Sequence, residues 1–207
     1  MKIVAVAFAE TFGVLFPIVD PIGNVVNFLA LTSGWEHARR RALIGQVTVF
    51  VIVGLSVFAL IGEPVLHFFG VSLEALQIAG GIIVGFTGFK MITASEAFVA
   101  EGLAGGNIAI TPLTIPLLAG PGAMAAILAL DSRDENLGLS LPGTIAAIAA
   151  IGACIWVAFS LGERLVGRLG AGGLAVLRIV MGLIVLAIGV EMVVHGIVNH
   201  GAVVEGT

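Results

Sequence analysis

The chain has 207 residues, of which 59% are hydrophobic and 11% are charged, and its formal net charge is −4. Soluble domains carry roughly 25% charged residues, so a chain this apolar cannot keep a wetted surface, and we expect one integral membrane domain over residues 1–207. No basic stripe supports nucleic-acid binding. The single cysteine, Cys154, excludes an intramolecular disulfide and a cysteine-based metal cluster.

Six apolar segments are long enough to cross a bilayer, which requires about 20 helical residues. Their approximate bounds are 3–31, 42–61, 73–92, 107–130, 141–161 and 173–198. The apolar runs are continuous rather than alternating, which predicts helices and not a β-barrel. The expected fold is therefore an all-α membrane protein with six transmembrane helices.

The first span is interrupted at residues 17–24, where two prolines bracket Asp20, and Gly23 and Asn24 follow. Proline removes a backbone donor and disfavours helix at the residue before it. We expect the helix to stop here and to restart over residues 25–33. Asn24 is then either the N-cap of this half-helix or a ligand of whatever occupies the gap.

Asp20 is the only carboxylate in either break. Charges inside a bilayer are costly and usually functional, which favours contact with a substrate amine, a cation or a coupling proton. The alternative is a structural role, in which Asp20 caps the broken helix. Asn27 lies one turn beyond Gly23 and either faces the same gap or forms a helix–helix hydrogen bond.

The fourth span is broken in the same way. Pro116 and Pro121 bracket Ala119 and Gly120, Gly122 follows, and the restarting half-helix is expected over residues 123–130. The start of a half-helix presents free N–H groups that suit an anion, and unwound carbonyls suit a cation or an ammonium group. Two such breaks at one depth would hold both ends of a small zwitterion, and the glycines favour a small substrate.

The two breaks belong to an internal repeat. Each ends in Leu-Ala-Leu, at 29–31 and 128–130, and the Gly-Glu pair at 62–63 recurs at 162–163. Residues 75–91 also resemble residues 176–192. We therefore expect two halves of three spans each, about 1–98 and about 107–200, joined by a linker at about 93–106. Since three is odd, the second half enters the membrane from the opposite face, giving an inverted 3+3 repeat with the first and fourth helices broken.

The basic residues are distributed unevenly between the two sides predicted by these spans. Lys2 and Arg133 fall on one side. The other side receives the remaining seven, namely Arg39, Arg40, Arg41, Lys90, Arg164, Arg168 and Arg178. Positive charge marks the cytoplasmic side, so we expect both termini to lie outside.

The motifs at these positions resemble those of the MarC family of six-span prokaryotic membrane proteins, over nearly the whole chain. They are Asp20-Pro21-Ile22-Gly23-Asn24, Gln77-Ile78-Ala79-Gly80-Gly81 and Pro116-Leu117-Leu118-Ala119-Gly120-Pro121-Gly122. The resemblance implies a plasma (inner) membrane location with periplasmic termini. Relatives of the SnatA type further imply transport of small neutral amino acids such as glycine and alanine.

Our hypothesis is a secondary transporter of small neutral amino acids. Its substrate-binding residues would be Asp20, Pro21, Gly23, Asn24, Asn27, Ala119, Gly120, Pro121 and Gly122. The alternative is a passive channel or exporter of small metabolites. A third possibility is a scaffold that transports nothing, but a scaffold does not require two helix breaks. Accumulation against a gradient distinguishes a carrier from a channel.

Cofactors and further partners follow from the same hypothesis. We expect no cofactor, no metal site and no enzyme activity, because the sequence has neither a His-Glu-x-x-His motif, nor a nucleophile elbow, nor paired membrane aspartates. Na⁺ and H⁺ are the candidate coupling ions, and the partners are a small-molecule substrate and the lipid bilayer. Gly81 and Gly85 favour close helix contact, either within one chain or between the copies of a homo-oligomer.

Overall fold

The computed structural model describes residues 2–93, 120–131 and 137–205. This part of the chain forms seven helices. They are α1 (Lys2–Val19), α2 (Asn24–Leu31), α3 (His37–Phe68), α4 (Leu73–Thr93), α5 (Pro121–Asp131), α6 (Leu137–Ser160) and α7 (Gly162–Glu205). Five helices are long and apolar enough to cross a membrane, namely α1, α3, α4, α6 and the Gly172–His200 part of α7. The prediction of an all-helical membrane protein is therefore confirmed.

The predicted break in the first span is present, because α1 ends at Val19 and α2 begins at Asn24. Of the predicted fourth span, only α5 lies among the described residues. Residues 107–119 lie outside them, and so does nearly all of the predicted linker, from residue 94 onward.

Two helices extend well beyond the predicted apolar spans. Helix α3 has 32 residues and includes the basic residues at its start and Glu63 near its end. Helix α7 covers 44 residues, but Gly170 interrupts it with φ 64 and ψ 174. Hydropathy locates the part of a helix that lies in lipid, whereas Arg, Glu and Lys are good helix formers and prolong it into water.

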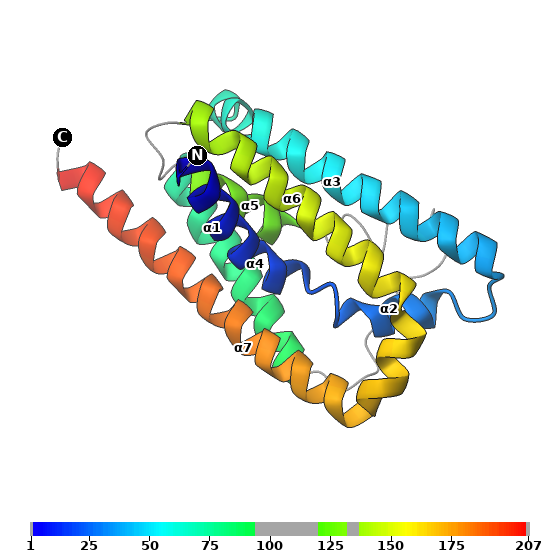
Figure 1. The fold of residues 1–207 in the computed structure, drawn as a ribbon. Helices are drawn as coiled ribbons and strands as arrows, with labels where there is room; N and C mark the ends of the chain where they lie inside the picture. The colour runs from blue at the N-terminus through cyan, green and yellow to red at the C-terminus, as the bar shows by residue number, and fades with distance from the viewer. Residues whose placement is uncertain (1, 94–119, 132–136, 206–207) are drawn as a thin grey trace.

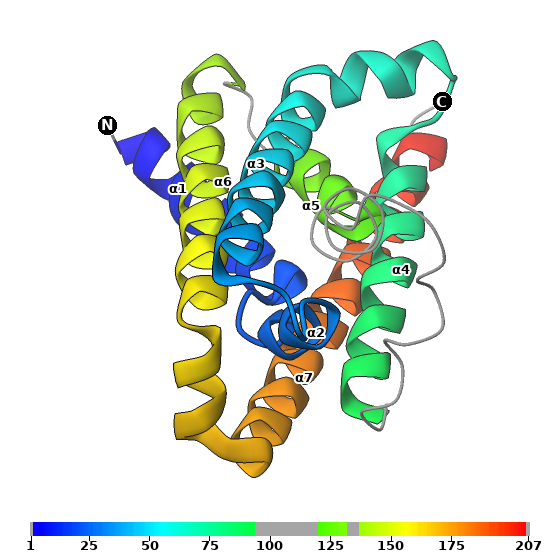
Figure 2. The same cartoon turned by 90° about the vertical axis from the view of Figure 1, so that its right-hand side faces the viewer.

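The helices form two layers that share α5 (Figure 1). One core cluster combines buried residues of α1, α2, α3, α5 and α6, and the second combines residues of α4, α5 and α7. Both termini lie at one end of the molecule with the end of α3 and the start of α6 (Figure 1). The start of α7 lies at the other end, below α2 in the rotated view (Figure 2).

Helices α4 and α7 approach closely through glycines. A Cβ atom at Gly81 would lie 2.6 Å from the carbonyl oxygen of Gly189, and one at Gly182 would lie 3.0 Å from the carbonyl oxygen of Gly88. A Cβ atom at Gly189 would also lie 2.6 Å from the Cα atom of Gly85. Small residues let two membrane helices pack at backbone distance. The close contact expected at Gly81 and Gly85 is therefore made within one chain.

This contact predicts the effect of adding one methyl group. Gly189→Ala places a Cβ atom against the backbone of α4, so we expect a loss of about 1–3 kcal/mol in the free energy of unfolding. The measurement is an SDS titration of the purified protein in mild detergent micelles. Gly54→Ala in α3 is the matched control, because a Cβ atom there meets nothing within 4 Å. Equal stability of the two variants would contradict the contact.

Candidate functional site

Asp20 closes the gap between α1 and α2. Its backbone has φ 41, in the left-handed region that only a few residue types tolerate, Asp among them. Its side chain is buried, and Oδ1 accepts a hydrogen bond of 3.0 Å from the backbone N–H of Gly23. Asp20 thus satisfies one of the free N–H groups at the start of α2. Among the described residues, no hydrogen bond is made by the second carboxylate oxygen, Oδ2.

Asn24 satisfies the opposite end of the gap. It is the first residue of α2 rather than its N-cap, and Gly23 holds the N-cap position without a side-chain bond. The Asn24 Nδ2 group instead donates to the carbonyl oxygens of Val19 at 3.0 Å and Asp20 at 3.2 Å. The expected N-cap role is therefore wrong, because the amide serves as a donor to the end of α1. Asn27 Nδ2 donates to Asn24 Oδ1 at 3.0 Å, so Asn27 reaches the gap through Asn24.

The second break is described from Gly120 onward. Gly120 is half-buried, its carbonyl oxygen accepts the first helical bond of α5 from Met124 N–H, and Pro121 opens the helix. Proline suits this position because the first N–H of a helix has no internal partner. Gly122 is buried, and a Cβ atom there would lie 2.6 Å from Val84 Cγ2. Ala119 lies outside the described residues.

The structure brings the flanks of the first break and the start of α5 into one core cluster. Val19 and Val25, on either side of the first break, share this cluster with Ala123 and Ile127 from the first turns of α5. Pro21 is also buried at the first break. Of the predicted site, the described residues thus form the gap at Asp20 and the start of α5 at Gly120, which border the same apolar core.

A cavity of about 340 Å³ lies between α1, α5 and α7. Its lining is apolar apart from one carboxylate and consists of Val14, Ala126, Ala129, Leu130, Ala187, Ile188, Glu191 and Met192. Glu191 forms a hydrogen bond with His195, one turn along α7, with 2.9 Å between Oε1 and Nε2. Within the part of the chain that is described, no group of three or more His, Cys, Asp or Glu side chains could hold a metal ion.

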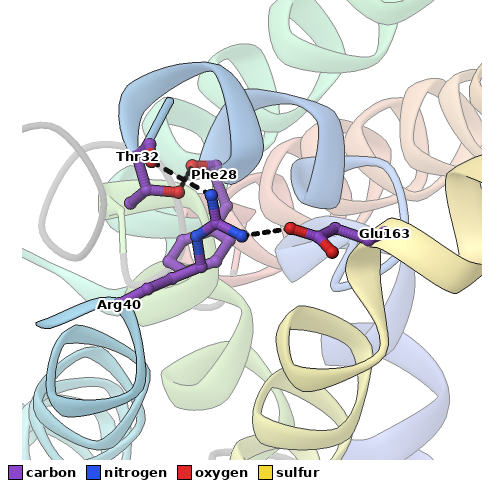
Figure 3. Close-up of polar contacts among 4 residues, drawn as sticks. All are labelled: Phe28, Thr32, Arg40 and Glu163. Carbon is purple, nitrogen blue, oxygen red and sulfur yellow. Dashed lines mark hydrogen bonds and ion pairs between the residues drawn. The ribbon is translucent and has the colours of Figure 1, made fainter. Parts of the chain in front are cut away.

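Sequence reasoning missed a polar contact at the far end of α2 (Figure 3). Arg40, at the start of α3, forms an ion pair with Glu163 at the start of α7 and donates from Nη2 to the carbonyl oxygen of Thr32 at 3.1 Å. Thr32 in turn donates from Oγ1 to the carbonyl oxygen of Phe28 at 2.8 Å. Glu163 was noticed only as half of the repeated Gly-Glu pair. A partner 123 residues away leaves no local signal in the sequence.

Comparison with known proteins agrees with the membrane class of the chain. The model of the family described as MarC family integral membrane protein matches residues 5–200, a range that includes both breaks. The chain belongs to the MarC family. This confirms the resemblance carried by the three motifs.

Relatives from bacteria and archaea match most of the chain. A UPF0056 membrane protein of Pyrococcus abyssi is 33% identical over 92% of this chain and 94% of its own length. The UPF0056 membrane protein YhcE of Escherichia coli is 33% identical, with 88% of each chain covered. The UPF0056 inner membrane protein MarC of Citrobacter koseri is 30% identical over 90% of this chain and 91% of its own. No solved structure matches.

The geometry at Asp20 predicts how substitutions there affect stability. Asp20→Ala loses the acceptor for the Gly23 N–H and keeps an unfavourable positive φ, so we expect a loss of about 1–3 kcal/mol in the free energy of unfolding. Asp20→Asn retains an oxygen acceptor and a residue type that tolerates this φ, so its stability should stay within about 1 kcal/mol of the parent. SDS titration of both variants measures the difference. Two equally stable variants would show that the cap contributes nothing.

Proposed function

We propose that this MarC-family protein is a secondary transporter of small neutral amino acids such as glycine and alanine, with the substrate bound between the two helix breaks. The single observation that carries the proposal is the buried break at Asp20, whose flanking residues share a core cluster with the first turns of α5. Interrupted helices in membranes are tolerated where the freed backbone groups are buried in protein or line a cavity, and transporters use them as binding sites.

The chemistry of the two gaps suits a small zwitterion. At the first gap, Asp20 Oδ1 is occupied by Gly23, which leaves Oδ2 for a substrate ammonium group or a coupling cation, Na⁺ or H⁺. At the second, the start of α5 presents the positive end of a helix, which suits a carboxylate. Gly120 and Gly122 carry no side chain, and Val84 packs against Gly122, so space for a larger substrate side chain is limited there.

We further propose six spans arranged as an inverted repeat, with the fourth span completed before α5. Contacts between the halves support this arrangement because they occur in symmetric pairs. Where a residue of the first half contacts a residue of the second, the counterparts of these two residues also contact each other. Gly62 packs against Leu128 of α5, and Gly162, its counterpart 100 residues later, packs against Leu29 of α2. A twofold relation between the halves produces such pairs, since Leu29 and Leu128 are themselves counterparts in the two Leu-Ala-Leu motifs.

The contact between α4 and α7 supports the same relation. Gly81 and Gly182 are counterparts, and so are Gly88 and Gly189. A Cβ atom at Gly81 would meet the carbonyl of Gly189, and one at Gly182 would meet the carbonyl of Gly88. Gly122 of α5 packs beside this contact, against Val84, which supports a second gap near the centre of the contact.

Orientation is part of the proposal. The uneven distribution of Lys and Arg places the connection that bears Arg39, Arg40 and Arg41 in the cytoplasm and both termini outside. The name of the Citrobacter relative, an inner membrane protein, supports a location in the plasma membrane. We propose transport rather than enzyme chemistry because the polar groups of the gaps are arranged to bind and to cap helices.

The test is uptake of radiolabelled glycine and alanine into proteoliposomes under a sodium gradient, a proton gradient, or neither. We expect accumulation under one gradient. Asp20→Asn should lower the rate about tenfold or more, because a charge-assisted hydrogen bond contributes about 1.5–3 kcal/mol. Gly120→Leu should block uptake by filling the second gap.

Gly54→Ala in α3 is the control and should transport normally, since a Cβ atom there meets no neighbour. Equilibration without accumulation would favour a passive channel. Uptake that is unchanged in both Asp20→Asn and Gly120→Leu would show that the site lies elsewhere. No uptake of either amino acid would contradict the assigned substrate class.

A further inference from the structure

We propose that Thr32, Arg40 and Glu163 form a gate that closes the end of the transport pathway at which α2 ends. We call these three residues the α2 gate. The inference rests on the proposed function, because a gate implies a pathway through the break at Asp20. It adds residues that touch no substrate and instead position the half-helix that carries the site.

Three elements meet at the α2 gate (Figure 3). Arg40 of α3 is held between the carbonyl oxygen of Thr32, the residue that follows α2, and the carboxylate of Glu163 at the start of α7. The side chain of Arg40 is only 17% exposed. The Thr32 hydroxyl donates to Phe28 within α2. The end of α2 is thus bound to both the start of α3 and the start of α7.

Helix α2 transmits this contact to the candidate site. It has eight residues, about 12 Å of helix, with Asn24 at one end and the α2 gate at the other. Its flank packs against the start of α7, where a Cβ atom at Gly162 would lie 3.0 Å from Val25 Cγ1. A short helix moves as a rigid unit, so loss of the Arg40–Glu163 pair lets α2 tilt away from α7 and alters the gap that Asn24 and Asp20 border.

The two ends of the molecule are unequal. The cavity lined by Val14, Leu130 and Glu191 lies toward the end that carries the termini, because Leu130 is next to the last residue of α5 and Leu128 packs on the late α3 residue Gly62. The counterpart of Arg40, 100 residues later, is Ser140, which carries no charge. The structure therefore combines a cavity at the end that carries the termini with an ion pair at the opposite end.

A gate must also open. Glu163 is 65% exposed, and ion pairs that reach solvent are weak and sensitive to salt. Arg40 keeps its bond to the Thr32 carbonyl when Glu163 is lost, so removal of the carboxylate should loosen α2 without unfolding it.

The test measures access to α2 by thiol labelling. In a Cys154→Ser background, Asn27→Cys places a single thiol between the break and the α2 gate, and a membrane-impermeant reagent is applied from each face of membrane vesicles. With the gate intact, labelling from the face that bears Arg39–Arg41 should be slow. Glu163→Gln should speed it about fivefold, the change expected when about 1 kcal/mol of ion-pair energy is lost.

Two controls make the result specific. Glu191→Gln removes the carboxylate that is hydrogen-bonded to His195 on the cavity side and should not change labelling from the Arg39–Arg41 face. Ser33→Cys, exposed beside Thr32, reports which face is labelled and should react equally with and without Glu163→Gln. Three results would contradict the gate. The Asn27→Cys thiol would be labelled at the same rate with and without Glu163→Gln, or Glu191→Gln would speed its labelling equally. The gate would also be contradicted if the thiol were not labelled in any variant.

Labelling requires no substrate, so its outcome is separate from that of the uptake assay. A gate that opens in Glu163→Gln, in a protein that takes up neither glycine nor alanine, would leave the gate in place and overturn only the substrate class. Uptake of these amino acids, together with a labelling rate that Glu163→Gln does not change, would support the substrate class and overturn only the gate.

Discussion

The gap between α1 and α2 exists only because its free backbone groups find partners inside the chain. In a bilayer, an unsatisfied N–H or C=O group costs several kcal/mol, since no water is present to replace the lost bond. Asp20 receives the Gly23 N–H, and Asn24 donates to the carbonyls of Val19 and Asp20. Each side chain thus caps the helix on the far side of the gap. Asp20 caps the start of α2, and Asn24 caps the end of α1. Among the described residues, Oδ2 of Asp20 accepts no hydrogen bond, and it is the atom that the proposed ligand would contact.

That arrangement shows why capping and binding at Asp20 are compatible rather than opposed. A carboxylate has two oxygens, and the cap uses one. The structural role fixes the position of the group, and the remaining oxygen carries charge beside the core cluster that the flanks of the gap share with the first turns of α5. The breaks also lie in a rigid frame, because α5 contacts both core clusters and the glycines of α4 and α7 bring those helices to backbone distance. We therefore propose that α2 is the element that moves relative to this frame, because it is short and is held at its far end by Arg40.

Sequence predicted the helical membrane class and the first break, because proline and glycine act locally and hydropathy reports lipid contact directly. It failed on the role of Asn24, since capping rules treat the side chain as an acceptor for the next helix, whereas the amide also donates to the preceding one. It also missed the extension of α3, where the chain leaves the apolar region but remains helical, and the interruption of α7 at Gly170. The Arg40–Glu163 pair joins residues 123 positions apart and required the folded chain. The same holds for the partner of Gly81, which only the packing of α7 identifies.

The central claim is that the two breaks form one site, and substrate protection across them tests it most directly. In a Cys154→Ser background, Gly120→Cys places a thiol in the second break, and its labelling rate is measured with and without saturating alanine. Ser33→Cys reports any general effect of alanine on the reagent. We predict that alanine slows labelling at position 120 and that Asp20→Asn, in the other half of the chain, abolishes this protection. Labelling that alanine leaves unchanged, or protection that survives Asp20→Asn, would contradict a shared site.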